Sequence, residues 1–507
     1  MRYDLLIPSQ LMGAMTPDLL LMGGAMVMML VAAWRTESDD HQRTVGWGSL
    51  VVLAATLGAV LWFAFGDATA GQGVIAVDKF RWAADVIFLL AAMGTVALGM
   101  DHNTRDGITH AESHVLVLFA TSGMMIMAAA RDLMILFLGL EMMSIAVYVL
   151  AGMNRRSERS AEGALKYFLL GAFATGFLLY GIALVYGATG STNTTEIGTR
   201  IMGYQLHHTA MLLVGVGLLL VGFGFKVAAV PFHMWSPDVY EGAPTPITAF
   251  MASAVKAAAF AGFFRVWIDA FSVLDFAWFA PVWWLASITM LVGNVVALAQ
   301  RNIKRMLAYS SIAHSGYLLV AIETGTHLGA AAFLFYLIAY TLATFGAFAI
   351  VATLTRVNEQ GLDIADYDGL WTVRPWLATA MAVCMLALLG FPIFGGVGFF
   401  AKWYLLQAAL SAEHMLIPLA VLLVLTSVVS AGYYLGVVRA MFMKPRAEGA
   451  PEIAPTGKMT RLVLGITIAA ILGLGVFPGR LARWTRQSVP VPPAAAAATA
   501  TGQTASR

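Results

Sequence analysis

The feature that most constrains this chain is a succession of apolar segments, each about as long as a bilayer is thick. A helix that crosses the hydrocarbon core of a membrane needs about 20 mostly apolar residues. About fourteen such segments follow one another, at 19–34, 47–65, 82–100, 115–130, 133–153, 161–187, 211–232, 246–267, 283–299, 306–322, 329–354, 376–409, 416–441 and 462–477. The sequence therefore predicts an all-α polytopic membrane protein.

The scarcity of charge supports this class and excludes others. Of 507 residues, 60% are hydrophobic and 11% are charged, whereas a soluble domain carries about 25% charged residues. Thirty basic and 28 acidic residues leave a net charge of +2, too balanced for a nucleic-acid binder. The single cysteine, Cys384, excludes intrachain disulfides and Cys₄ metal or cluster sites. Without a P-loop or a GxGxxG after a strand, we expect no cofactor and no metal in this chain.

The distribution of basic residues predicts the orientation in the membrane. Lysine and arginine collect in alternate loops, and such loops are cytoplasmic by the positive-inside rule. An even number of spans then puts both termini on the periplasmic side, although Arg480, Arg483 and Arg486 after the last span argue against this. The Pro- and Ala-rich tail, 487–507, is expected to be disordered. The loops in question contain Arg35, Arg43, Arg105, Arg155, Arg156, Arg159, Arg301, Lys304, Arg305, Arg356, Arg374, Arg439, Lys444, Arg446, Lys458 and Arg461.

Two ionisable residues lie in the middle of predicted spans. A charge inside a bilayer costs a few kcal/mol at least and usually marks a pathway or a paired site. Lys256 is roughly 12–15 Å from either end of its helix, too far for its stem to reach the interface easily. Glu141 is placed similarly and has a shorter side chain. Both are therefore candidate functional residues.

Two further lysines lie beside expected helix breaks. Lys226 precedes Pro231 by five residues, and Lys402 follows the Gly/Pro-rich run 390–398 inside the overlong segment 376–409. Charged sites at discontinuous helices are typical of secondary transporters. The alternative for Lys226 is that its helix simply ends and the ammonium reaches the interface. Lys166, five residues inside its helix, is equally compatible with a site and with a position at the interface.

The two expected breaks suggest an internal repeat. They fall in the seventh and twelfth spans, five spans apart, which predicts two inverted five-helix repeats at 115–267 (helices 4–8) and 283–441 (helices 9–13). Residues 1–114 would then form helices 1–3, and 442–486 would form helix 14. Sequence self-similarity between the halves is weak, so the prediction depends on the positions of the breaks.

Histidine and tyrosine add candidates for proton transfer. His233 directly follows the Pro231 break, and His314 lies inside the tenth span with Tyr309 nearby. A histidine there can relay protons between lysines, or it can simply bond one helix to another. Both alternatives remain open from the sequence, and Asp85 in the third span receives no role.

Several motifs carry a family resemblance. The stretch 225–246, FKVAAVPFHMWSPDVYEGAPTP, resembles the antiporter-like membrane subunits of respiratory complex I, the NADH:quinone oxidoreductase. The runs Pro-Asp-Val-Tyr at 237–240, Ile-Ala-His-Ser-Gly-Tyr at 312–317 and Lys-Trp-Tyr at 402–404 are more similar to subunit N than to subunits L and M. The resemblance covers roughly 19–477.

The resemblance implies both architecture and roles. It implies fourteen helices, inverted five-helix repeats and broken seventh and twelfth helices. It implies a non-redox translocase subunit of a bacterial inner membrane, with L-, M-, K- and J-type subunits as partners and with FMN, Fe–S clusters and quinone held elsewhere in the complex. The family's proton-translocating positions match Glu141, Lys166, Lys226, Lys256 and Lys402, and further polar positions match His233, Tyr309 and His314.

The functional hypothesis is proton translocation driven by quinone reduction in other subunits. Movement of Glu141 relative to Lys226 would change the proton affinity of the lysine, and the proton would pass to Lys256 and then to Lys402. One alternative is a cation/proton antiporter subunit of a related Mrp- or hydrogenase-type complex. The other is a scaffold subunit whose buried charges are inert ion pairs.

Overall fold

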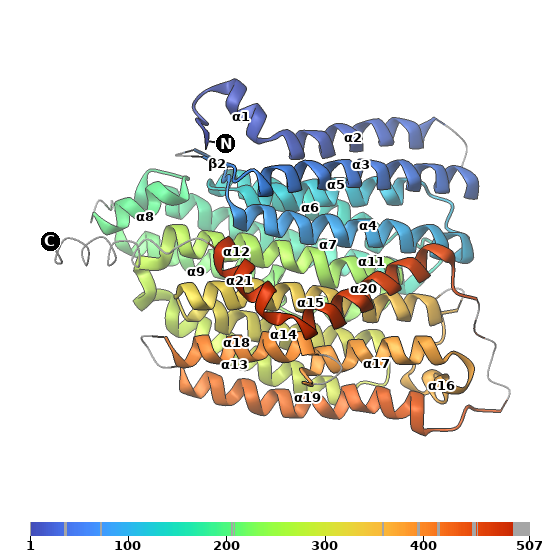
Figure 1. Cartoon of the computed structure of the whole chain (residues 1–507). Coiled ribbons are helices and arrows are strands. Elements are labelled where there is room, and N and C mark those ends of the chain that lie inside the picture. Colours follow the sequence, from blue (N-terminus) through green and yellow to red (C-terminus); the bar gives the residue numbers. More distant parts are fainter. Residues whose placement is uncertain are drawn as a thin grey trace.

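The computed structural model describes residues 2–34, 38–70, 73–203, 206, 208–356, 359–392, 396–412, 416–448, 453 and 455–489. This part of the chain is helical almost throughout, and its helices run side by side in one elongated bundle (Figure 1). Its only strands, β1 (Arg2–Tyr3) and β2 (Thr69–Ala70), form one short parallel pair. Residues 490–507 of the predicted tail lie outside the described residues. The last helix ends at Ser488, so it includes the first two residues of the range predicted for the tail, 487–507.

The N-terminal half of the bundle contains α1 (Pro8–Ala14), α2 (Thr16–Ala33), α3 (Asp39–Phe65), α4 (Lys79–Asp106), α5 (Glu112–Ala129), α6 (Leu133–Ala151), α7 (Glu158–Thr189), α8 (Thr194–Met202), α9 (Thr209–Lys226), α10 (Trp235–Gly242), α11 (Thr245–Phe250), the π-helical turn η1 (Met251–Val255) and α12 (Lys256–Phe271). The C-terminal half contains η2 (Ser272–Leu274), α13 (Asp275–Leu298), α14 (Ile303–Glu323), α15 (His327–Leu354), η4 (Ile364–Tyr367), α16 (Leu370–Val373), α17 (Pro375–Leu389), α18 (Gly396–Leu410), α19 (Ile417–Met443), α20 (Lys458–Val476) and α21 (Pro478–Ser488).

Eleven helical segments of the described chain are long and apolar enough to cross a membrane, with α11 to α13 counted as one continuous segment, Thr245–Leu298. Although α14 has 21 residues, it does not reach the same apolarity. The predicted class, an all-helical membrane protein, is confirmed.

Many helices begin at a side chain that accepts the first free backbone N–H groups. Asp132 caps α6, Ser157 caps α7 and Asn302 caps α14, each by accepting from N–H groups two or three residues on. Proline at the first turn starts α17 and α19, where its missing N–H costs nothing. At these helix ends, backbone N–H groups that could not form hydrogen bonds with lipid are therefore paired within the chain.

One helix ends at Lys226, and another ends inside the predicted segment that contains Lys402. Lys226 is the last residue of α9, and the next helix, α10, begins only at Trp235, beyond Pro231. The predicted segment 376–409 is divided between α17, which ends before Gly390 in a left-handed conformation (φ 81°), and α18. Residues 393–395 of that predicted break lie outside the described residues.

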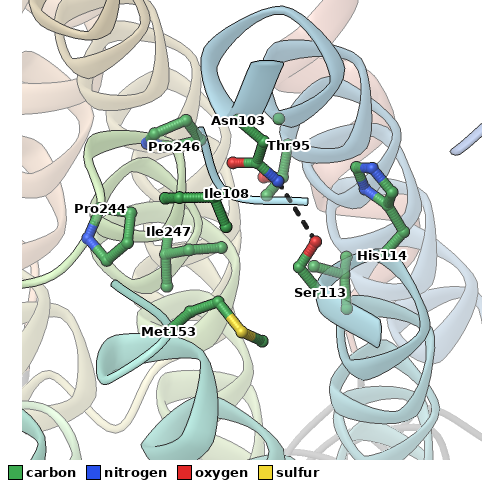
Figure 2. Close-up of a pocket in the computed structure, with 11 residues that line it drawn as sticks. Thr95, Asn103, Ile108, Ser113, His114, Met153, Pro244, Pro246 and Ile247 are labelled. Atoms are coloured by element: carbon green, nitrogen blue, oxygen red, sulfur yellow. Dashed lines mark hydrogen bonds between the residues drawn. The ribbon is translucent and has the colours of Figure 1, made fainter. Parts of the chain in front are cut away.

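The candidate Lys256 follows a different irregularity. Helix α11 passes through the π-helical turn η1 before α12 begins at Lys256. Such turns insert one extra residue per turn and are frequent at functional sites. Near the start of α11, a cavity of about 10 Å³ lies between α4, α5 and the Pro244–Ile247 segment, and Asn103 Nδ2 donates to Ser113 Oγ at 3.3 Å beside it (Figure 2).

Glycines bring α13 and α14 into backbone contact. A Cβ on Gly293 would lie 2.5 Å from the backbone N of Ala313, and one on Gly316 would lie 2.8 Å from the backbone N of Met290. Small residues at helix crossings allow such an approach in membrane proteins. Nearly every residue of α14 is buried, so this helix forms the centre of the C-terminal half.

We expect Gly293→Ala to separate α13 from α14, because the added methyl group meets backbone and not a flexible side chain. The cost should be about 1–3 kcal/mol of unfolding free energy, as for other overpacked sites. Thermal unfolding of the purified protein assembly in mild detergent measures it. Gly217→Ala on α9, where a Cβ meets nothing within 4 Å, is the matched control. Equal thermal stability of the two variants would contradict the expectation.

Candidate functional site

The ammonium group of Lys226 is held inside the bundle by α6. The residue is 5% exposed, and its Nζ donates to Ser144 Oγ at 2.7 Å and to Tyr148 OH at 3.1 Å. Nζ also lies 5.5 Å from the centre of the Tyr148 ring, a cation–π distance. The lysine therefore turns towards α6, and its ammonium group is buried in the bundle and not exposed at its surface.

Glu141 lies on the same helix, one turn before Ser144. Its carboxylate is half-buried and accepts from Thr175 Oγ1 of α7 at 2.8 Å. Among the described residues, no carboxylate oxygen comes within 4.0 Å of Lys226 Nζ. Glu141 and Lys226 thus form no direct ion pair in this structure. Ser144, one turn after Glu141 on α6, is the residue that contacts the Lys226 ammonium.

Lys256 is bound entirely by α14. The residue is 2% exposed, and its Nζ donates to Ser311 O at 2.8 Å, Ser311 Oγ at 2.5 Å and Ser315 Oγ at 3.0 Å. Ser315 Oγ in turn donates at 2.6 Å to the carbonyl of Val227, the residue after Lys226. One serine therefore connects the surroundings of the two lysines.

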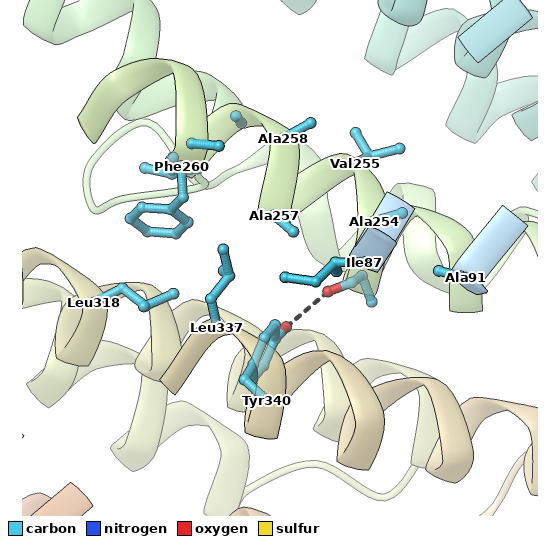
Figure 3. Close-up of a cluster of buried hydrophobic side chains, with 14 of the residues drawn as sticks. Ile87, Ala91, Ala254, Val255, Ala257, Ala258, Phe260, Leu318, Leu337 and Tyr340 are labelled. Atoms are coloured by element: carbon cyan, nitrogen blue, oxygen red, sulfur yellow. Dashed lines mark hydrogen bonds between the residues drawn. The ribbon is translucent and has the colours of Figure 1, made fainter. Parts of the chain in front are cut away.

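The rest of this environment is apolar. Figure 3 shows Ala257 and Phe260 facing Leu337, and Tyr340 OH donates to the carbonyl of Ala252 at 2.9 Å. Hydroxyl groups are therefore the principal polar partners available to the ammonium group.

His314 of α14 connects α15 to α19. It is 3% exposed, with Nδ1 2.6 Å from Tyr336 OH and Nε2 3.0 Å from Tyr434 OH. A neutral imidazole donates from one nitrogen and accepts at the other, so the two hydroxyls have opposite roles. The Tyr340 ring lies beside it, tilted by 37° with ring centres 5.0 Å apart, and Tyr340 OH is bonded to Ser311 Oγ at 2.7 Å. His314 thus adjoins the group that binds Lys256.

Lys402 lies on the other side of His314. It is 9% exposed, donates to the carbonyl of Leu389 at the end of α17 (2.9 Å), and lies 5.0 Å from the centre of the Tyr317 ring. With His314 and Tyr336 it lines a cavity of about 10 Å³, which is at the lower limit of the space that one water needs.

Three other predicted residues lie outside this group. The Lys166 side chain is 41% exposed and pairs with Glu162 and Asp238, each at 2.7 Å. Tyr309 packs against the apolar core, and its hydroxyl makes no hydrogen bond with a described residue. His233 lies in the segment between α9 and α10, and its Nδ1 has no hydrogen-bond partner in the described chain. The hydroxyl of Tyr309 therefore makes no hydrogen bond with His314 in this structure, and a relay role for Tyr309 stays a prediction.

The partners of the lysines and of His314 were missed from the sequence. They are hydroxyl side chains in otherwise apolar helices: Ser144, Tyr148, Ser311, Ser315, Tyr336, Tyr340 and Tyr434. The four-residue spacing of Ser311 and Ser315, and of Tyr336 and Tyr340, was a usable signal, because it puts each pair on one helix face.

A second polar group lies where α4 ends and α11 and α14 begin. Glu359 accepts from Thr245 N at 2.9 Å and Oγ1 at 2.5 Å, and from Lys304 Nζ at 3.2 Å. Burial raises the pKa of Glu359, but the Lys304 ammonium, His102 and Thr245 outweigh it and hold the pKa below its ordinary value of 4.5. The charged carboxylate thus caps α11, the helix that leads to Lys256.

The same group offers three ligand atoms to a metal but does not suit one. Atoms of His102, Asp106 and Glu359 lie within 4.8 Å of one another. However, Arg105 Nη2 donates to His102 Nδ1 at 2.9 Å, so the proton of the neutral ring is on Nε2, which faces the carboxylates. Lys304 already supplies positive charge to Glu359. A proton, and not a metal ion, fits this position.

Comparison with known proteins assigns the chain to a family. Residues 130–430 match the family described as NADH:quinone oxidoreductase/Mrp antiporter, TM. The chain is 48% identical to NADH-quinone oxidoreductase subunit N of Gemmatimonas aurantiaca, covering 96% of this chain and 95% of the relative. It is 43% identical to subunit N of Trichlorobacter lovleyi, covering 93% and 96%.

Solved structures share the fold. A chain of respiratory complex I from Thermus thermophilus superposes with a TM-score of 0.77 at 35% identity, covering 93% of this chain and all of that one. A chain of the Mrp complex from Dietzia gives 0.79 at 20% identity, covering 93% and 97%, and shares the fold alone. The fold and sequence therefore define an antiporter-like membrane subunit.

More narrowly, the chain belongs to the NADH-quinone oxidoreductase subunit N family, multi-pass membrane subunits of respiratory complex I. The family resemblance drawn from the motifs at 225–246, 312–317 and 402–404 is confirmed.

We expect Glu359→Gln to lower the unfolding free energy by about 3–5 kcal/mol, because it leaves the Lys304 ammonium buried without a carboxylate. A depressed pKa stabilises the fold above the ordinary value of 4.5, and this contribution is lost as the pH falls below that value. The difference should therefore be constant near neutral pH. Thermal unfolding checks it, with Glu112→Gln at the exposed start of α5 as control. A deficit that changes between mildly acidic and mildly alkaline buffer would refute this account.

Proposed function

We propose that this chain translocates protons as a non-redox membrane subunit of NADH:quinone oxidoreductase, driven by quinone reduction in other subunits. The observation that carries the proposal is a near-continuous run of buried polar groups between two helix ends. In order, it comprises Ser144, Lys226, the Val227 carbonyl, Ser315, Lys256, Ser311, Tyr340, His314 and Lys402. Buried ionisable groups in membrane helices usually mark ion pathways.

The kind of partner supports a transfer role for the lysines. A lysine taken out of water and bound only by neutral groups can gain or lose its proton when a nearby charge moves. Lys226, Lys256 and Lys402 are bound by hydroxyl and carbonyl oxygens and lack a carboxylate within 4.0 Å in the described chain. The alternative, a scaffold subunit whose buried charges are inert ion pairs, requires a carboxylate in contact with each lysine.

The proposed sequence begins at Glu141 and ends beyond Lys402. Displacement of the Glu141 carboxylate from Thr175 towards Ser144 would stabilise the Lys226 ammonium, and its return would release the proton to Lys256. His314 and its tyrosines would carry the proton to Lys402. Moving one charge against 100 mV costs about 2.3 kcal/mol, so the drive comes from the redox subunits, where FMN, Fe–S clusters and quinone are bound.

The finer architecture forms part of the proposal. Separating α12 from α13 at η2, and adding α14 and the α17–α18 pair, raises the eleven candidate spans to fourteen. The helix ends at Lys226 and Leu389 are five spans apart in that count, which supports inverted five-helix repeats at 115–267 and 283–441 with discontinuous helices 7 and 12. Helices 1–3 would occupy 1–114 and helix 14 would occupy 442–486.

Location and partners follow from the family. We propose the bacterial inner membrane, L-, M-, K- and J-type subunits as neighbours, and both termini in the periplasm. The end of α2 and the beginning of α20 lie at the same end of the bundle (Figure 1), and the basic loops include Arg105, Arg301 and Lys458. We call this end the basic end and propose that it is cytoplasmic.

The Mrp-type antiporter alternative shares the fold but is less well supported. The identity to the Mrp chain is 20%, against 35% to the complex I chain and 48% to a subunit N. Sodium-dependent pH change in vesicles without NADH activity would favour that alternative.

We expect Lys256→Ala to abolish or strongly impair proton uptake by the assembled complex, since no other described ammonium occupies the Ser311–Ser315 position. The complex is purified in mild detergent, its subunits are identified by mass spectrometry, and uptake is measured in proteoliposomes. Lys79→Ala, with a side chain 49% exposed, is the control. Uptake at parental rate and stoichiometry in a fully assembled Lys256→Ala complex would refute the proposal.

Glu141→Gln should give a milder form of the same defect. The amide can still accept from Thr175 but cannot supply a moving negative charge near Ser144. NADH:quinone turnover and proton uptake are compared with those of Glu158→Gln, at the exposed start of α7. Unchanged coupled turnover would exclude Glu141 from the mechanism.

A further inference from the structure

We propose that Glu323 is the group that exchanges protons with water at the end of the bundle opposite the basic end. The inference extends the proposed proton-translocation function and depends on it. It assigns the final exchange to a residue that directly follows the predicted span 306–322.

Helix α14 carries buried polar side chains in its middle and a buried ionisable residue near each end. It begins near Lys304, which is fully buried, and ends at Glu323, which is 4% exposed. Between them it presents Ser310, Ser311, His314, Ser315 and Tyr317, all buried. The serines that bind Lys256 are on this helix too, so α14 carries both part of the proposed pathway and the two terminal ionisable residues.

The two ends of α14 differ in a way that points to function. Lys304 is paired with Glu359 and bonded to the Ala243 carbonyl. Neither carboxylate oxygen of Glu323 has a hydrogen-bond partner among the described residues, and no described cation lies within 4.0 Å of it. Asp85, whose oxygens also lack hydrogen bonds, does have Arg81 at 3.6 Å.

A structural role does not explain such a carboxylate. Burying an unpaired carboxyl group lowers stability, whether it is charged or neutral. Gly325, two residues further on, is exposed, so the carboxyl group lies just beneath the surface. A group in this position can take up a proton from the interior and release it to water outside.

The step from the proposed axis to Glu323 is a plain proton transfer. An N–H bond of the Lys402 ammonium breaks and an O–H bond forms on the Glu323 carboxylate; release to outer water restores the carboxylate. Tyr317 adjoins Lys402, and Glu323 follows Tyr317 by six positions on the same helix, a rise of about 9 Å. Since residues 318–322 are apolar, water must carry the proton over this distance.

The test is Glu323→Gln in the assembled complex, reconstituted in proteoliposomes. We expect proton uptake per NADH oxidised to fall several-fold while the subunit composition is unchanged and thermal stability is equal or higher. Glu323→Asp, which keeps the proton chemistry, should recover part of the loss. Asp275→Asn, an exposed acid at the start of α13, should leave uptake unchanged.

The outcomes separate this inference from the proposed function. A defect in Lys256→Ala with normal uptake in Glu323→Gln would overturn the role of Glu323 and leave proton translocation standing. Normal uptake in both variants would overturn both. Lower thermal stability of both Glu323→Gln and Glu323→Asp, with uptake per NADH unchanged in whatever complex remains, would mean that the carboxylate is structural and would also refute the inference.

Discussion

The arrangement of the interior depends on how one ammonium group is solvated without water. Lys256 needs acceptors for its three N–H donors, and all of them come from one face of α14. That face is within reach because α11 and α12 are joined through a π-helical turn and because α14 is held against α13 by glycine contacts. A change in the π-helical turn or in the contact between α13 and α14 would move the serine oxygens away from the Lys256 nitrogen. The position of the charge therefore depends on the packing of three helices together.

Charges are treated differently at the ends of the bundle and in its middle. Near the ends, arginines and lysines are fixed by carboxylates, as in Arg81 with Asp18, Arg265 with Asp78, and Lys304 with Glu359. In the middle, Lys226, Lys256 and Lys402 are bound by neutral oxygen atoms, with no carboxylate of the described chain within 4.0 Å. Separating a buried ion pair costs several kcal/mol, whereas exchanging one hydroxyl partner for another costs far less. The ends are thus electrostatically rigid, while the charges in the middle are held by neutral partners that cost little to exchange.

The sequence predicted much of this organisation because its signals are local. Apolar segments, proline and glycine breaks, and the isolated positions of Glu141 and Lys256 can all be recognised without knowing any contact. The partners of these residues could not be predicted, since the hydroxyls of Ser311 and Tyr434 reach their partners only through helix rotation and crossing. Glu323 was assigned to a loop because helix ends cannot be located to within a residue or two. Glu359 was missed because a loop brings it to Thr245, 114 residues away.

The polarity of α14 also bears on how the protein is made. A helix enters lipid from the translocon according to its own hydrophobicity, and each central charge or polar group lowers that tendency. With its serines, histidine and terminal ionisable residues, α14 does not reach the apolarity of its neighbours. Helix α13 precedes it by a short connection and supplies the glycine surface on which it packs. The low hydrophobicity of α14 is thus matched by a neighbour in the chain that packs against it closely along one side.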